Sequence, residues 1–242
     1  MAFKKIKNWL LDLIFPYHCL GCQQLLENRP YPLCSQCEEE LKPFVGWVCP
    51  VCFKKLDPLK LKPCPACQKK TKLKALYASQ SYQNPIIQKL IQNFKYKNIR
   101  SLAQPLARLI MNGLEPEIKN FKNKESLAFI PIPLAQKRYK ERGYNQAELL
   151  AKEISHYFQI NFLPDALYRI KYQTPQVKVK NYQARKENIR GAFKVVRPEK
   201  IKGKTIFLVD DVYTTGATLN EAAKVLKESG AKEVFGIVVA RD

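Results

Sequence analysis

Residues 206–218, IFLVDDVYTTGAT, constrain the fold more than any other stretch of the chain. The apolar residues 206–209 form a run of strand length, and Asp210 and Asp211 follow directly. In an open α/β sheet, such residues emerge at the carboxyl end of a buried strand, where ligands bind. We therefore expect a mostly parallel sheet whose carboxyl edge presents two carboxylates, which can accept hydrogen bonds from ribose hydroxyls.

Residues 214–218, TTGAT, follow the acid pair and are called the signature turn below. Their small and hydroxyl side chains favour a turn, and Thr218 with Glu221 has the capping-box spacing of a helix start. Free backbone N–H groups and the positive helix end would then face one point, which suits a phosphate. The alternative is an ordinary strand–turn–helix connection in which the acids only cap the helix.

The whole stretch resembles the phosphoribosyl pyrophosphate (PRPP) signature of type I phosphoribosyltransferases. The resemblance implies that the acid pair contacts the ribose 2- and 3-hydroxyls, directly or through Mg²⁺, and that the following loop wraps the 5-phosphate. The PRPP-binding residues that it implies are Asp210, Asp211, Val212, Tyr213, Thr214, Thr215, Gly216, Ala217 and Thr218.

All eight cysteines lie before Lys70, in two successive copies of the pattern CxxC, eleven residues, CxxC. Each CxxC turn places two thiolates on one side of a tight knuckle, and two knuckles complete a tetrahedral set that suits Zn²⁺. A disulfide framework is the alternative, but the sequence lacks a secretory signal and has no further cysteine, which favours a reducing compartment. The predicted zinc ligands are Cys19, Cys22, Cys34, Cys37, Cys49, Cys52, Cys64 and Cys67.

The spacing leaves the pairing of the four knuckles open. Two tandem ribbons would each use four consecutive cysteines, whereas a cross-braced module would interleave the pairs. The tandem form is preferred because each local loop closes at a lower entropic cost. Four thiolates leave no position for water, so both zinc ions are expected to be structural and not catalytic.

Composition indicates two domains and a polyanionic partner. A chain of 242 residues with 46% hydrophobic residues can hold one good-sized domain and a small module. We expect an N-terminal helix and double zinc ribbon in residues 1–72 and a phosphoribosyltransferase-like domain in residues 73–242. The formal net charge of +21 favours nucleic acid or anionic lipid as a partner. The alternative is a lysine-rich compositional bias, since the charge is spread along the chain.

The N-terminal segment has the pattern of an amphipathic helix. One helical face carries Phe3, Ile6, Trp9 or Leu10, and Leu13, and it would lie on a membrane surface or, as we favour, dock on the protein itself. Its apolar stretch is short and is interrupted by Asp12, so it does not fit a targeting signal. No run approaches the roughly twenty apolar residues of a transmembrane span. We therefore expect a cytoplasmic protein.

A second strand and helix flank a basic segment in the middle of the chain. Residues 127–132 read as a buried strand, and a basic loop then leads into a helix near Asn145. Arg138, Arg142 and Gly143 in this loop would bring guanidinium groups and an unhindered backbone to the carboxyl edge, where a diphosphate could bind. A solvated basic loop is the alternative. Tyr139 and Tyr144 would also suit base stacking with a single-stranded nucleic acid.

Residues 174–193 are polar and basic and lead into the strand-like GAFKVV. A long loop of this kind is either a functional lid or simply disordered, and its basic residues favour a lid over an anionic ligand. Between the cysteines and the acid pair, the chain also predicts a strand over 75–82 and a helix that begins at Asn84–Pro85. The expected fold class is α/β, with a type I phosphoribosyltransferase-like, mostly parallel sheet, helices on both faces and a small N-terminal zinc-ribbon module.

Four features in order are similar to the ComF family of competence-associated proteins: the paired CxxC knuckles, IPIPLAQKRYKERGYNQAELLA, TPQ with the later ARKENIRGAF, and LVDDVYTTGATL. The resemblance implies PRPP and single-stranded DNA binding and a role in DNA uptake during natural transformation, with the uptake machinery at the inner membrane face as a possible partner. A Mg-dependent transferase acting on an unidentified nucleobase or amine is the alternative. In that case Arg138 and Arg142 would stabilise the departing diphosphate.

Overall fold

The computed structural model describes residues 17–26, 32–41, 46–119, 121, 123–170 and 189–242. The predicted amphipathic N-terminal helix and most of the predicted loop at 174–193 lie outside the described residues. Within the described residues, the end of that loop forms the predicted strand as β6 (Phe193–Val195).

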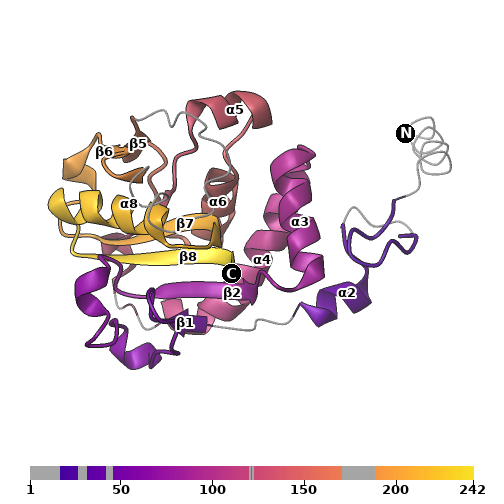
Figure 1. Ribbon diagram of the computed structural model, residues 1–242, viewed down its shortest axis with the longest axis horizontal. Coiled ribbons are helices and arrows are strands. Elements are labelled where there is room, and N and C mark those ends of the chain that lie inside the picture. Colours follow the sequence, from indigo (N-terminus) through magenta and orange to yellow (C-terminus); the bar gives the residue numbers. More distant parts are fainter. Residues whose placement is uncertain (1–16, 27–31, 42–45, 120, 122, 171–188) are drawn as a thin grey trace.

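A six-stranded sheet forms the centre of the molecule, in the order β1-β2-β8-β7-β3-β4 (Figure 1). All neighbouring strands are parallel except β1, which pairs with β2 in the antiparallel sense. The predicted mostly parallel sheet is therefore confirmed. Its strands are β1 (Gly46–Val48), β2 (Leu76–Ser81), β3 (Leu127–Pro131), β4 (Asn161–Phe162), β7 (Thr205–Tyr213) and β8 (Glu233–Arg241).

Helices cover both faces of the sheet. On one face lie α3 (Pro85–Tyr96), α4 (Ala103–Ile118) and α6 (Gln146–Phe158), and on the other lies α8 (Ala217–Glu228). The side chains of β7 show why helices pack on both faces of the sheet. Phe207 points to the α4 and α6 side, where its ring packs on Phe129 and Phe235, whereas Ile206 and Leu208 point to the α8 side. Continuous apolar strands of this kind are typical of a parallel sheet buried on both faces.

Helix α3 begins where the sequence predicts. The Asn84 side chain caps it by accepting hydrogen bonds from the backbone N–H groups of Ile86 and Ile87, at 2.9 and 3.3 Å. Pro85 at the first helical position needs no such partner. Its buried residues, which include Ile87, Ile91 and Phe94, recur at helical spacing and face the sheet.

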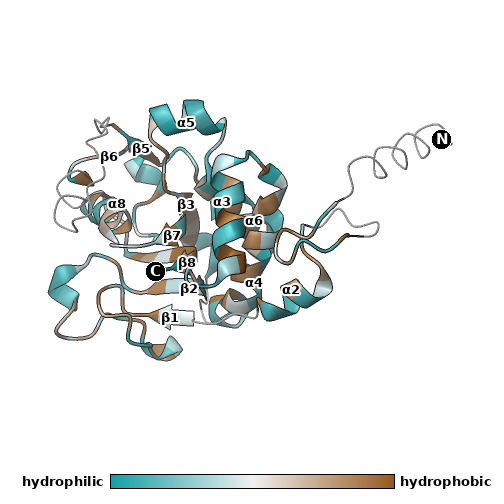
Figure 2. Ribbon diagram, turned by 45° about the vertical axis from the view of Figure 1, so that its right-hand side comes forward, coloured by the Kyte–Doolittle hydropathy of each residue, from teal (hydrophilic) through white to brown (hydrophobic). Residues whose placement is uncertain are grey.

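Shorter elements complete the described part of the chain. Strands β5 (Leu167–Arg169) and β6 form a separate antiparallel pair, and α2 (Ser35–Glu40) follows the third cysteine. Helix α5 (Gln136–Arg142) stands above the carboxyl edge and is hydrophilic along its length (Figure 2). Single 3-10 turns span Pro58–Lys60, Gln68–Lys70, Arg100–Leu102, Lys124–Ser126 and Pro198–Lys200.

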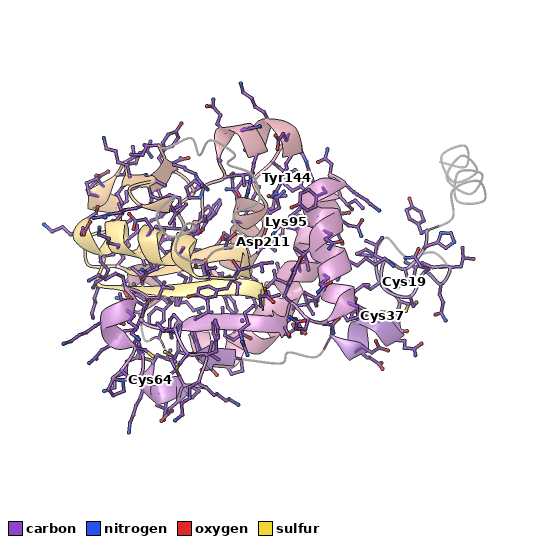
Figure 3. The ribbon with its side chains drawn as sticks, viewed as in Figure 1. Cys19, Cys37, Cys64, Lys95, Tyr144 and Asp211 are labelled. Carbon is purple, nitrogen blue, oxygen red and sulfur yellow. The ribbon has the colours of Figure 1, made fainter. Side chains whose placement is uncertain are left out.

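The two groups of four cysteines lie at different places on the molecule. The first ribbon, residues 19–37, lies beside α3, and the second ribbon, residues 49–67, lies below β8 and α8 (Figures 1 and 3). Strand β1 precedes the second ribbon and belongs to the main sheet, where Trp47 packs on Tyr77 and Phe235. The span predicted for the zinc module therefore contributes a strand to the sheet. The division of the chain after residue 72 stays a prediction.

Three local expectations were wrong. Strand β7 does not end before the acid pair but continues to Tyr213, because β8 runs beside it and pairs Asp210 with Val238 and Tyr213 with Arg241. The predicted basic loop is largely the helix α5, whose sequence QKRYKER consists mostly of good helix formers.

The predicted capping box at Thr218 and Glu221 is also absent from this helix start. Helix α8 starts at Ala217 behind Gly216, which is left-handed with φ +72°, and no side chain caps it. The Glu221 carboxylate instead accepts a hydrogen bond from the Gly191 backbone N–H at 2.7 Å. This hydrogen bond links α8 to the segment before β6.

Candidate functional site

The carboxyl ends of β2, β8, β7 and β3 meet at one edge of the sheet, and the acid pair lies there. Successive strand residues point to opposite faces, so Asp210 and Asp211 do not share an environment. Asp211 is buried and Asp210 is half-buried. The Asp211 backbone N–H donates to the Asp210 carboxylate at 2.9 Å, which holds the Asp210 side chain against the strand.

Lys95, in the last turn of α3, forms a salt bridge with Asp211 (Figure 3). The Lys95 Nζ and Asp211 Oδ1 atoms are 2.6 Å apart, and only 19% and 10% of the two side chains is exposed. Burial alone would lower the pKa of Lys95, but the Asp211 carboxylate and, more weakly, Asp210 raise it above the usual value. Lys95 is thus held as a cation beside the acid pair.

The sequence analysis did not include Lys95 in the site. Lys95 follows the buried Ile91 by four residues, so it lies on the inward side of α3. A charged residue at an inward helical position is the signal that could have identified it, because a buried ammonium needs a partner.

The Asp210 carboxyl has a raised pKa. Burial and the neighbouring Asp211 charge raise the pKa of Asp210 to about 7, against the opposing effects of Lys95 and Arg169. A carboxylate that titrates near neutral pH at a sheet edge is a feature of functional sites.

Arg169, on β5, adds a second cation that the sequence analysis missed. Its guanidinium lies 5.6 Å from the Phe193 ring centre, and its Nε is buried without a hydrogen-bond partner among the described residues. Burial and the Arg138 charge lower the pKa of Arg169, whereas Asp210 opposes this. Arg138 on α5, Arg169 and Asp210 therefore act on one region. No motif surrounds Arg169 in the sequence, and only the pairing of β5 with β6 brings it there.

The segment RGYNQ after α5 shapes the edge through its own hydrogen bonds. Gly143 ends α5 in a left-handed conformation, and its carbonyl accepts a hydrogen bond from Arg100 at 3.0 Å. Asn145 caps α6 by accepting from the Ala147 N–H at 3.1 Å, and its amide donates to the Ile132 carbonyl at 3.0 Å. Arg142 donates to the Gln146 side chain at 2.9 Å.

The predicted role of Tyr144 in base stacking is wrong. The Tyr144 side chain is buried, and its hydroxyl donates to the Phe94 carbonyl of α3, the residue before Lys95. Arg100 covers the Tyr144 ring at 5.0 Å. Tyr144 therefore ties the segment after α5 to α3 and offers no free face to a base. Tyr139 on α5 is half exposed.

Tyr213 lies directly beneath the signature turn. A Cβ atom at Gly216 would overlap the Tyr213 ring, so the turn closes over this ring only with glycine at that position. The Tyr213 side chain is 3% exposed, and its hydroxyl donates to the Pro50 carbonyl at 2.7 Å. Phe53 packs edge-on against the same ring at 5.9 Å. Pro50 and Phe53 belong to the second ribbon, which therefore supports the signature turn.

Each ribbon brings four thiols together in the tandem arrangement. The sulfur atoms of Cys19, Cys22, Cys34 and Cys37 lie within 4.8 Å of one another, and so do those of Cys49, Cys52, Cys64 and Cys67. The tandem pairing is therefore confirmed, and the interleaved pairing is excluded. All eight cysteines are free of disulfides.

The sulfur geometry fits tetrahedral zinc. Cys22 and Cys34 have their sulfur atoms 3.6 Å apart, and so do Cys52 and Cys64. Zinc–sulfur bonds of about 2.3 Å give a sulfur–sulfur distance of about 3.8 Å in a tetrahedron. Burial and neighbouring thiols raise the pKa of Cys67 to about 12, so four thiolates need a cation to coexist. The two sites fit structural zinc, with all four positions filled by the chain.

None of the helices formed by described residues is both long enough and apolar enough to cross a membrane.

Comparisons with known proteins match both parts of the chain. Residues 10–68 match the double zinc ribbon domain family, and residues 143–242 match the phosphoribosyl transferase domain family. A protein of Haemophilus influenzae named competence protein F is 32% identical over 223 residues, which cover 91% of this chain and 95% of that protein.

Two further relatives match over shorter spans. Competence protein ComFC of Streptococcus pneumoniae is 32% identical over 134 residues, 53% of each chain. The DNA utilization protein YhgH of Escherichia coli K12 is 29% identical over 154 residues, which cover 62% of this chain and 65% of that protein.

Proposed function

Because the chain belongs to the ComF family of competence proteins, we propose that it binds PRPP at the carboxyl edge and handles single-stranded DNA during uptake. The observation that carries the proposal is the acid pair at the end of β7, next to a glycine-dependent turn that opens α8. Relatives named for competence and for DNA utilization support the DNA half of the proposal.

In this proposal, different residues at the carboxyl edge of the sheet bind the ribose, the 5-phosphate and the diphosphate of PRPP. Asp210 and Asp211 hold the ribose hydroxyls, and the signature turn holds the 5-phosphate with its backbone N–H groups. The diphosphate lies toward Arg138, Arg142 and Gly143, with Arg169 as a further cation. The carboxylate oxygens fit Mg²⁺, because Asp210 has no salt bridge with a described residue and oxygen is the ligand that Mg²⁺ prefers. Bound Mg²⁺ would neutralise the diphosphate charge.

The proposal places the protein in the cytoplasm, with the DNA-uptake machinery at the inner membrane face as a partner. Eight free cysteines in zinc-binding groups fit a reducing compartment. The net charge of +21 favours association with the phosphates of DNA.

A transferase acting on a nucleobase or amine acceptor is the second candidate function. The observation that favours it is Asp210, whose pKa of about 7 suits a general base at neutral pH. A screen of acceptors for diphosphate release separates the two candidates. Turnover that Asp210→Asn abolishes would support the transferase, whereas tight PRPP binding without turnover would reject it.

The test of the PRPP site uses two glycines with the same backbone angle. Gly216 and Gly203 both have φ +72°, but a Cβ at Gly216 would meet the Tyr213 ring, whereas a Cβ at Gly203 meets nothing within 4 Å. Gly216→Ala should abolish saturable Mg·PRPP binding, and Gly203→Ala should leave it unchanged, as measured by equilibrium dialysis. Equal affinity in the two variants would mean that the signature turn does not hold the ligand.

A further inference from the structure

A lysine-rich cavity of about 860 Å³ lies between the second ribbon and the signature turn. One wall is residues 69–72 with the knuckle at Pro50 and Phe53, and the other is the signature turn with the first turns of α8. Its size is that of a ligand pocket, since such pockets measure roughly 300 to 1,000 Å³.

Hydrogen bonds on two sides hold the walls of this cavity in place. On one side, the Asn220 side chain of α8 accepts hydrogen bonds from the Thr71 hydroxyl at 3.1 Å and the Lys72 backbone N–H at 2.6 Å. On the other side, Tyr213 donates to the Pro50 carbonyl at 2.7 Å. The lysine-bearing segment is therefore fixed against the domain that carries the signature turn, and the cavity is preformed.

The lining combines cationic and apolar groups. Lys69, Lys70, Lys72 and Lys224 line the cavity, and none of them forms a salt bridge with another described residue. The carboxylate of Glu221 also lines it, but this group already accepts the Gly191 hydrogen bond. Phe53 and Ile189 provide apolar surface next to the lysines.

The cavity is separate from the proposed ribose site. Asp210 and Asp211 are not among the residues that line it, and Asp211 instead faces Lys95 on α3. The cavity therefore lacks the carboxylates that would hold the ribose hydroxyls of PRPP. The four lysines suit the backbone of a single strand, because proteins that bind single strands follow the phosphates with a positively charged groove.

We propose that the lysines of this cavity bind the backbone phosphates of a single-stranded nucleic acid, beside the signature turn that would hold the 5-phosphate of PRPP. The inference rests on the DNA half of the proposed function and locates the strand between the second ribbon and α8. The lysines that would bind the strand are not among the residues assigned to PRPP, so we expect both ligands to bind at the same time.

The test replaces three cavity lysines and, as a control, three exposed lysines elsewhere. The cavity variant is Lys69→Gln/Lys72→Gln/Lys224→Gln, and the control is Lys152→Gln/Lys200→Gln/Lys202→Gln, which has the same net charge. Binding of a fluorescent oligothymidylate to the zinc-loaded protein is measured by anisotropy over a range of salt. Zinc content and thermal unfolding show whether both variants are folded.

Loss of three phosphate contacts should reduce the salt slope by about 2, since each contributes about 0.7 for a single strand. Over the tenfold range from about 1 M to 0.1 M salt, this corresponds to about a hundredfold weaker binding at the lower salt. The control should keep its slope. An equal loss in both variants would overturn the inference, because it would show a response to net charge alone.

Titrations with Mg·PRPP distinguish a nucleic-acid site in the cavity from a PRPP site there. Mg·PRPP should bind both variants with unchanged affinity and should not displace the oligonucleotide. Competitive displacement would assign the cavity to the phosphates of PRPP and overturn the inference. A wild-type protein that binds PRPP but no oligonucleotide would reject the cavity site and the DNA half of the proposed function together. Oligonucleotide binding without PRPP binding would reject only the PRPP half.

Discussion

The salt bridge between Lys95 and Asp211 gives a sharp prediction about stability. Replacing Lys95 with methionine keeps the length of the side chain but leaves the Asp211 carboxylate buried beside an apolar group. Removing one partner of a buried ion pair costs about 3 to 5 kcal/mol. Because 19% and 10% of the two side chains is exposed, we expect the lower end, about 3 kcal/mol.

The loss should appear as a lower melting temperature, by about 6 to 12 °C for a domain of this size. The assay is thermal and urea unfolding of the zinc-loaded protein, followed by circular dichroism at neutral pH. Lys89→Met is the matched control on α3, because the Lys89 ammonium donates to the Gly21 carbonyl at 3.3 Å and forms no salt bridge with another described residue. We expect it to cost less than about 1 kcal/mol.

A second substitution tests whether the unpaired Asp211 carboxylate causes the loss of stability. Asp211→Asn in the Lys95→Met background removes the uncompensated charge, so the double variant should recover about 2 kcal/mol of the loss. A Lys95→Met variant as stable as Lys89→Met would refute the reasoning. So would a double variant that is less stable than Lys95→Met alone, because the two side chains would then contribute independently.

Two further predictions concern the acid pair and the zinc sites. The pKa of Asp210 is raised to about 7 in the folded protein, so the folded state binds a proton that the unfolded state has lost. The wild type should therefore lose stability relative to Asp210→Asn as pH rises from about 4 to 7. Urea unfolding of both proteins across this range measures the difference in unfolding free energy, and a difference that does not change with pH would contradict the prediction. Zinc analysis should find two ions per wild-type chain and one in each of the variants Cys22→Ser/Cys34→Ser and Cys52→Ser/Cys64→Ser. The second-ribbon variant should weaken PRPP binding, because that ribbon contacts Tyr213 beneath the signature turn, whereas the first-ribbon variant should leave it unchanged.

Much of this architecture follows from local sequence. The apolar run of β7 predicts a strand and the small residues of the signature turn predict a turn before a helix, because both are set by residues next to one another, although the predicted strand end and capping box were wrong. The eight cysteines predict two zinc sites for the same reason, since each knuckle is a local turn.

What the sequence analysis missed depends on contacts between distant segments. Lys95 reaches Asp211 only after α3 packs beside β7, and Arg169 enters the site only through the β5–β6 pair. Tyr144 looked free in a basic segment, yet the fold buries it against α3. The β7 strand continues past the acids because β8 pairs with it, which no local pattern encodes.

Calorimetric titration of Mg·PRPP into the zinc-loaded protein tests the central claim most directly, beside the Asp210→Asn/Asp211→Asn variant at equal salt. The titration is run at a temperature at which circular dichroism shows both proteins folded. We predict saturable binding of one PRPP per chain in the wild type and none in the variant. Equal heats and affinities in the two proteins, or no binding in the wild type, would contradict a PRPP site built on the acid pair.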